Sequence, residues 1–363
     1  MKVSKLGLGC MRLPKTYADK EDIDYNKAKE IVDYAYSHGI TYYDTAYYYH
    51  GGMSEEFLGK ALKEYPRESF NIATKMPGWD LKSEEDLERI FNNQLKRLQV
   101  DYFDYYLYHA VSSGTLPNFY KYNCYEFLMD KKKEGKIRNL GFSFHDTPDV
   151  LKTLLDQFKW DFAQIQLNYL DWNEQNANKQ YELLCEYNVP CIVMEPVRGG
   201  LLADLGPEAN EIFKEVRPEC SVASWAIRYV ASLSNVLTVL SGMSNMDQII
   251  DNINTFKNFE SLSHEEHEVI ERAVYAFKKK KLIPCSACRY CMDCPSGVDI
   301  PVMFQLYNEY IMNMNKDIFK EQYMKIEDDK HAKNCTECNN CVQYCPQGIN
   351  IPLVMTEIKK LTG

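Results

Sequence analysis

Eight short β-rich segments alternate with longer amphipathic segments from the N-terminus to about residue 257, and this alternation strongly limits the possible folds. The predicted strands are Lys5–Gly9, Ile40–Asp44, Phe70–Thr74, Phe103–Tyr108, Ile137–Phe142, Phe162–Gln166, Cys191–Met194 and Val236–Leu240. The segments between them have the apolar spacing of helices. Strands that alternate with helices form parallel βαβ units, and eight units match a (β/α)₈ barrel better than an open sheet. We therefore predict an α/β fold built on a (β/α)₈ (TIM) barrel.

The turn after the first predicted strand argues against a Rossmann domain. No Gly-x-Gly-x-x-Gly pattern opens a helix there, because Gly7-Leu8-Gly9 is followed by Cys-Met-Arg. That glycine pattern is what brings a dinucleotide pyrophosphate onto a helix N-terminus in a Rossmann fold.

A second, cysteine-rich part follows the barrel. Eight of the 13 cysteines lie there in two runs: Cys285, Cys288, Cys291 and Cys294, then Cys335, Cys338, Cys341 and Cys345. Clustered cysteines in a reducing compartment indicate metal rather than disulfides. The second run has the bacterial [4Fe–4S] spacing, with Pro after its last cysteine, and the first run is one residue shorter.

In two-cluster ferredoxins the fourth cysteine of each run ligates the other cluster. Carried over to this chain, one cluster takes Cys285, Cys288, Cys291 and Cys345, and the other takes Cys335, Cys338, Cys341 and Cys294. The alternative is a pair of zinc sites, which leaves the third regular cysteine and the Cys-Pro ending of each run unexplained. Residues 302–326 between the runs have helical patterning. We therefore predict a barrel with its C-terminal helix over residues 1–281 and a small helical ferredoxin-like domain over residues 282–363.

Charge and hydropathy exclude some classes of partner. The chain of 363 residues carries 42 Lys and Arg against 52 Asp and Glu, a formal net charge of -10, which disfavours binding to nucleic acid. No apolar run approaches the roughly 18 residues of a membrane span. The N-terminal residues also lack the apolar core of a signal peptide. We expect a cytoplasmic protein with no nucleic-acid or membrane partner.

Three polar side chains end neighbouring strands of the predicted barrel, where barrel enzymes place their catalytic groups. Asp44 ends the second strand, Lys75 follows the third and His109 follows the fourth, with three tyrosines at residues 47–49. Taken singly, each could be a cap, a surface pair or a core histidine. Together they predict one site in which Lys75, held by Asp44, lowers the pKa of a tyrosine that acts as a proton donor. His109 would hydrogen-bond to a carbonyl oxygen.

The residues around this site resemble the aldo/keto reductases, over residues 1 to about 257. The matching segments are Tyr43-Asp-Thr-Ala-Tyr-Tyr-Tyr-His-Gly, Ser54-Glu-Glu-Phe-Leu-Gly-Lys-Ala-Leu, Ala73-Thr-Lys and Asp104-Tyr-Tyr-Leu-Tyr-His. The whole chain is similar to the subgroup with a C-terminal ferredoxin-like domain carrying two [4Fe–4S] clusters. The resemblance selects Tyr49 as the catalytic tyrosine, in a tetrad with Asp44, Lys75 and His109.

The same resemblance implies an extended NAD(P)H bound without a Rossmann fold. It places the dinucleotide against Asp44, Ser143, Gln164, Met194, Gly199, Ser241, Gly242, Met243, Gln248 and Asn252. Ser143 and Gln164 would hold the carboxamide, and the segments 194–200 and 241–244 the pyrophosphate and adenosine. Met243 and Gln248 stand where NADPH-preferring members carry Lys and Arg. Without those cations a 2′-phosphate is poorly compensated, which favours NADH.

The sequence therefore predicts an NAD(P)H-dependent oxidoreductase that reduces a small aldehyde or ketone. The alternative function is a redox relay or sensor that exchanges electrons with a protein partner through its clusters. A hydride carries two electrons and each cluster takes one, and no flavin motif is present to split them. A barrel that binds ligands without turnover is the third possibility, and the complete tetrad disfavours it.

Overall fold

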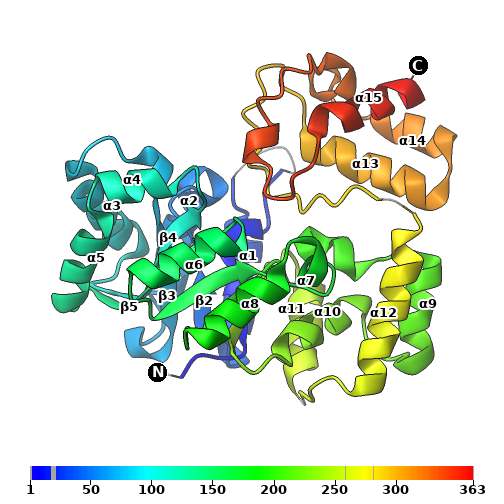
Figure 1. The fold of residues 1–363 in the computed structure, drawn as a ribbon. Coiled ribbons are helices and arrows are strands. Elements are labelled where there is room, and N and C mark those ends of the chain that lie inside the picture. The colour runs from blue at the N-terminus through cyan, green and yellow to red at the C-terminus, as the bar shows by residue number, and fades with distance from the viewer. Residues whose placement is uncertain (1, 18–21, 258, 281, 363) are drawn as a thin grey trace. The chain divides into compact units, whose positions relative to one another are not determined.

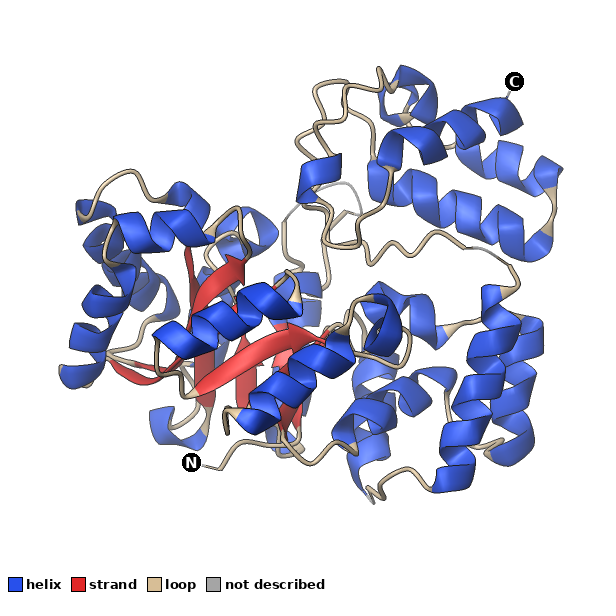
Figure 2. Cartoon of the chain, viewed as in Figure 1, coloured by secondary structure: helices blue, strands red, loops and turns tan. Residues whose placement is uncertain are grey.

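The computed structural model describes residues 2–17, 22–257, 259–280 and 282–362. Within these ranges eight parallel strands close into a barrel in chain order, with β1 paired to β8. Figures 1 and 2 show the strands of the barrel among the surrounding helices. The strands are β1 Leu6–Gly9, β2 Tyr42–Asp44, β3 Asn71–Pro77, β4 Phe103–Val111, β5 Ile137–Phe144, β6 Phe162–Gln166, β7 Cys191–Met194 and β8 Val236–Ser241. The predicted (β/α)₈ barrel is confirmed, and each predicted strand overlaps its counterpart.

One or more helices follow each strand, as the βαβ pattern requires (Figure 1). Those up to β7 are α1 Tyr25–Ser37, α2 Met53–Leu62, α3 Glu85–Leu98, α4 Leu116–Lys121, α5 Cys124–Lys133, α6 Pro148–Gln157, α7 Asp171–Glu174 and α8 Ala177–Glu186. After β7 come α9 Pro207–Val216, α10 Val222–Ala231, α11 Met246–Lys257, α12 His264–Lys278, α13 Ile300–Asn313, α14 Lys316–Tyr323 and α15 Ile351–Thr362.

The chain forms two compact units. The first contains residues 1–196 and 226–262, and the second contains residues 197–225 and 263–363. The second unit therefore contains α9 and α12 together with the cysteine-rich part. Arg217, which directly follows α9, forms an ion pair with Glu266 of α12 at 2.6 Å. The predicted boundary between residues 281 and 282 stays a prediction, and Lys281 lies outside the described residues.

Alternation along the strands explains why polar groups gather at one end of the barrel. Tyr42, Ala73 and Leu107 belong to a buried cluster, together with Tyr105, Phe162, Ile192 and Leu240. Asp44, Lys75 and His109 each lie two residues beyond one of these three, and side chains two residues apart share a face of a strand. The barrel interior therefore ends in a polar layer at the carboxyl ends of β2, β3 and β4.

Glycine at position 141 makes room for this interior packing. A Cβ at Gly141 would lie 2.5 Å from the carbonyl oxygen of Phe162 and 2.6 Å from its ring. A larger residue on β5 would displace the phenyl ring from the buried cluster.

The cysteine-rich part of the second unit is helical. Helices α13, α14 and α15 share an apolar core that includes Ile300, Phe304, Phe319, Met355 and Ile358. The helical patterning predicted for residues 302–326 is thus confirmed. Of the helices described, none is long and apolar enough to cross a membrane.

Candidate active site and thiol pockets

The ammonium group of Lys75 lies at the centre of the contacts in the polar layer. Its Nζ donates to Oδ1 of Asp44 at 2.6 Å and to the carbonyl oxygen of Thr45 at 2.7 Å. It also lies 3.4 Å from the Tyr49 hydroxyl and 4.8 Å from the centre of that ring. Lys75 and Asp44 are 1% and 3% exposed. A buried ion pair therefore stands directly behind the phenol.

The loop after β2 carries Tyr49 to this position. It forms a short 3₁₀ segment, Tyr49–Gly52, in which His50 and Gly51 have φ values of 53° and 61°. The Nε2 of the buried His50 accepts a hydrogen bond from the Leu13 amide at 3.2 Å. Tyr49 as a residue is half-buried, and its hydroxyl lies next to Lys75.

His109 lies on the other side of the phenol. The rings of Tyr49 and His109 meet edge to face, with their centres 5.9 Å apart. The ring centres of Trp79 and His109 are 4.9 Å apart. Among the described residues the buried Nδ1 of His109 has no hydrogen-bond partner. A buried polar atom without a partner is costly, and a ligand that satisfies it would bind here at a gain.

The proton affinity of Tyr49 differs from our prediction. Burial raises the pKa of Tyr49 well above its ordinary value, the Asp44 carboxylate raises it further, and Arg12 only partly opposes them. The predicted lowering of the Tyr49 pKa is wrong for this structure, because burial of the phenol dominates and the Asp44 carboxylate acts in the same direction. The phenol therefore keeps its proton at neutral pH.

His109 is neutral for the same physical reason. Burial lowers the pKa of His109 well below its ordinary value, and the nearby charge of Lys75 and the His145 ring lower it further. A neutral imidazole can donate one ring N–H to a carbonyl oxygen without adding a second cation beside Lys75.

Of the two side chains predicted to hold a carboxamide, Gln164 is the better placed. Its Nε2 donates to Sδ of Met194 at 3.6 Å, and its buried Oε1 has no partner among the described residues. Ser143 is already engaged, because its Oγ accepts from the Ala110 amide at 2.8 Å. The Ser143 hydroxyl thereby supports the backbone next to His109.

The residues near β8 that were predicted to contact the dinucleotide differ in how deeply they are buried. Asn252 donates to the Ser241 hydroxyl at 2.9 Å, and both are buried. Gly242 is exposed, and Gln248 is exposed and accepts from the Ser244 amide at 2.7 Å. Met243 is fully buried in the apolar core of the barrel. Its side chain therefore packs the fold.

One ion pair at the barrel mouth was not identified from the sequence. Arg12, after β1, contacts Glu195, after β7, with Nη2 and Oε1 2.9 Å apart. Glu195 has a φ of 56°, which is strained for a residue with a side chain. Both residues follow strand ends, so the rule that selected Asp44 could also have selected them.

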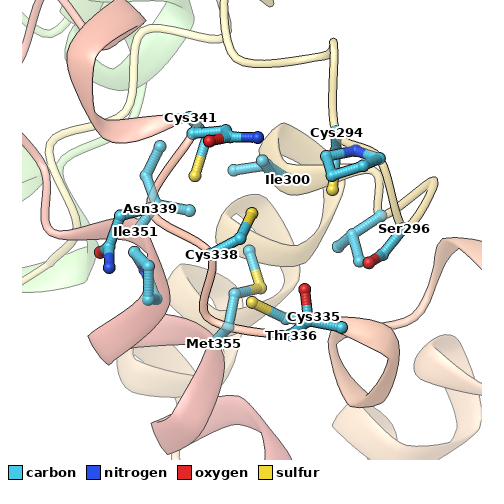
Figure 3. A pocket seen from close by; sticks show the side chains of 14 residues that line it. Cys294, Ser296, Ile300, Cys335, Thr336, Cys338, Asn339, Cys341, Ile351 and Met355 are labelled. Carbon is cyan, nitrogen blue, oxygen red and sulfur yellow. The ribbon is translucent and has the colours of Figure 1, made fainter.

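The second unit holds two pockets, each lined by four cysteines. The first pocket is lined by Cys285, Cys288, Cys291 and Cys345. The second is lined by Cys294, Cys335, Cys338 and Cys341. Figure 3 shows the thiols of the second pocket gathered around the same space. Each pocket thus combines three cysteines of one run with the last cysteine of the other.

The donor set bears on the identity of the metal. A structural zinc site needs four ligands, at Zn–S distances of about 2.3 Å. Here three regularly spaced cysteines of one run and the last cysteine of the other line each pocket, which is the cysteine arrangement of a two-cluster ferredoxin. The donor set therefore fits a four-iron cluster better than zinc.

Gly199, predicted to contact the dinucleotide, belongs to the second unit. Its Cα faces Ser286, whose side chain lines the first pocket.

Two family models match the chain. The model described as "Aldo/keto reductase family" matches residues 5–274, and the model described as "4Fe-4S dicluster domain" matches residues 284–349. The first match covers most of the chain and includes all four residues of the polar site.

Individual relatives match the barrel. A probable aldo-keto reductase 1 of Glycine max is 31% identical over 219 residues, or 57% of this chain and 60% of that protein. The NADH-specific methylglyoxal reductase of Escherichia coli is 26% identical over 65% of this chain and 85% of that protein. Among solved structures, the holo form of aldo-keto reductase AKR11C1 from Bacillus halodurans has a TM-score of 0.59 and 28% identity, and the match covers 75% of this chain and 92% of that one.

Proposed function

Because the chain belongs to the aldo/keto reductase family and carries a C-terminal 4Fe–4S dicluster domain, we propose that its barrel reduces a small aldehyde or ketone with Tyr49 as the general acid. The observation that carries this proposal is the short chain of contacts from Asp44 through Lys75 to the Tyr49 hydroxyl. It puts a protonated phenol beside a buried cation at the barrel mouth.

Tyr49 and the three groups around it have different roles in the reaction. Tyr49 donates its proton to the carbonyl oxygen as negative charge develops there. Lys75 lies 3.4 Å from the phenol oxygen and stabilises the phenolate that remains, while Asp44 fixes the ammonium at 2.6 Å. His109 orients the carbonyl through a ring nitrogen. The indole ring of Trp79 packs against His109, with ring centres 4.9 Å apart, and provides an apolar surface next to the imidazole.

A reduced nicotinamide dinucleotide supplies the hydride when bound. The unpartnered Oε1 of Gln164 offers an acceptor for a carboxamide N–H, which fits this cofactor. The buried Met243 and the exposed Gln248 place no cation for a 2′-phosphate. We therefore propose a preference for NADH.

The pKa directions predict the pH dependence of the reduction. The acid form of Tyr49 is the active form, and its raised pKa keeps it protonated through pH 10, the ordinary value for tyrosine. His109 is active when neutral, and its lowered pKa keeps it neutral down to pH 6.5 and below. We expect a flat kcat for NADH-dependent carbonyl reduction between these limits. A loss of rate with a midpoint near pH 7 or 8 would contradict the assignment of Tyr49.

We further propose that each thiol pocket holds one [4Fe–4S] cluster. The four thiolates would bind the corners of the cluster, and the surrounding apolar residues, among them Ile300 and Ile351 between the two pockets, would limit water access. The dicluster family model supports the same proposal.

Paired cysteine variants test which thiols share a cluster. If Cys345 shares a cluster with Cys285, the double variant Cys285→Ser/Cys345→Ser loses no more iron than either single variant. The double variant Cys335→Ser/Cys345→Ser then loses both clusters. Iron and sulfide are measured on protein purified without oxygen. The reverse pattern would show that each run ligates its own cluster.

Exposure of the second pocket favours a second function, electron exchange with a protein partner. Cys338 and its neighbours Glu337 and Asn339 are exposed, whereas Cys291 of the first pocket is buried. Anaerobic EPR before and after addition of NADH tests it. Cluster reduction at the rate of catalysis would favour the relay, and clusters that stay oxidised through many turnovers would exclude it.

A further inference from the structure

The segment that follows β7 has an unusual backbone. A 3₁₀ segment, Arg198–Ala203, begins four residues after Met194, the last residue of the strand. Arg198, Gly199 and Gly200 have φ values of 47°, 65° and 100°. For Arg198 this left-handed conformation is strained, so contacts elsewhere must hold it.

Those contacts come from the cysteine-rich part of the same unit. Arg198 is 2% exposed, and its Nη2 donates to Oε1 of Gln347 at 3.3 Å. At Gly199 the approach is closer still, because a Cβ there would lie 1.9 Å from the carbonyl oxygen of Ser286. Only glycine permits both this distance and the positive φ.

The two contacted residues belong to the wall of the first thiol pocket. Ser286 follows Cys285, and Gln347 lies two residues after Cys345. These two cysteines come from different runs, yet their thiols line one pocket. Residues 198–199 therefore touch both chain segments that must come together for a cluster to bind there.

Arg198 also links this pocket to the dinucleotide side through the chain itself. Only Glu195, Pro196 and Val197 separate it from Met194, whose sulfur accepts from Gln164. The backbone that Arg198 and Gly199 hold is thus continuous, over three residues, with residues that we propose to contact NADH.

We propose that Arg198 is a positioning residue for the first cluster pocket, and that a cluster in this pocket fixes the loop after β7 and thereby strengthens NADH binding. The inference rests on the proposed function for the identity of both ligands. It assigns to the first cluster a role that needs no electron transfer, namely holding a strained loop in its binding conformation.

The test compares full-length protein purified without oxygen as wild type and as Arg198→Gln. It measures the rate of iron release to a chelator and the NADH dissociation constant. Loss of one buried charge-assisted hydrogen bond is costly. We therefore expect at least about tenfold faster release of one portion of the iron and about tenfold weaker NADH binding, which corresponds to about 1.4 kcal/mol. Arg198→Lys retains the charge, and its rate of iron release and NADH dissociation constant should lie between those of wild type and Arg198→Gln.

Lys359→Gln is the matched control. Lys359 donates to the carbonyl oxygen of Cys335, a second-pocket residue, at 2.8 Å. We expect this variant to speed release of the other portion of the iron and to leave NADH affinity unchanged. The two portions are identified by comparison with Cys345→Ser, which lacks the first cluster, and Cys338→Ser, which lacks the second.

The same cysteine variants serve if Arg198→Gln fails to fold. We expect NADH to bind about tenfold more weakly to Cys345→Ser than to Cys338→Ser. Equal NADH affinities in these two variants, or unchanged affinity in a folded Arg198→Gln, would overturn the inference. A wild-type protein that binds no NADH or no iron would instead overturn the proposed function.

Discussion

Tyr49→Phe is expected to lower kcat for carbonyl reduction by about 10²–10⁴-fold, the usual contribution of a general acid. The change removes one oxygen atom, which lies 3.4 Å from Nζ of Lys75. The ring stays, with its contacts to Lys75 and His109. The effect should therefore fall on kcat, while the NADH dissociation constant stays close to that of wild type.

Tyr47→Phe provides the matched control. Its hydroxyl accepts from Asn93 at 3.2 Å, and its ring packs under Arg97. It makes the same chemical change two residues away, at a buried tyrosine whose hydroxyl contacts Asn93 rather than Lys75, and we expect kcat within about twofold of wild type. Equal rates for wild type and Tyr49→Phe in single-turnover measurements would remove Tyr49 from the mechanism.

Lys75→Met is expected to lower the free energy of unfolding by about 3–5 kcal/mol, the usual cost of removing one partner of a buried ion pair. The variant leaves the Asp44 carboxylate buried, with one oxygen that already has no partner among the described residues. Denaturation by urea measures the loss. Activity should fall as well, because the phenolate left by Tyr49 would have no cation beside it.

The double variant Lys75→Met/Asp44→Asn separates stability from catalysis. Replacing both members of a buried pair is often nearly neutral, so most of the lost stability should return while the reduction rate stays low.

In the single variant Lys75→Met, Asp44 has a raised pKa in the folded state, because burial already raises it and the opposing charge of Lys75 is gone. The difference in free energy of unfolding between wild type and Lys75→Met should therefore be smallest at low pH and grow as pH rises. A single variant as stable as wild type at pH 7 would contradict the buried ion pair.

The sequence was sufficient for the barrel and for three residues of the site, because both follow from periodicity. β6 and β7 begin and end where we predicted them, and Asp44, Lys75 and His109 follow from the rule that polar groups gather at strand ends. The choice of Tyr49 from three consecutive tyrosines needed the family resemblance. Only the backbone turn at His50 and Gly51 determines which phenol reaches Lys75.

Properties that depend on burial were beyond sequence reasoning. The spacing of Lys75 and Tyr49 suggested a lowered pKa, whereas burial raises it. In the same way Met243, which the family resemblance placed at a cofactor contact, is enclosed by the barrel core. The extent of desolvation depends on every neighbour of a side chain, and a linear motif contains few of them.

The shared construction of the two thiol pockets has a consequence for biosynthesis. Each pocket needs cysteines from both ends of the segment between residues 285 and 345. A nascent chain that has emerged only as far as α14 thus offers the cysteines of the first run and none of the second. If each pocket holds one cluster, as we propose, neither cluster has its four thiolates until Cys335–Cys345 has left the ribosome, so the two pockets should be filled in close succession.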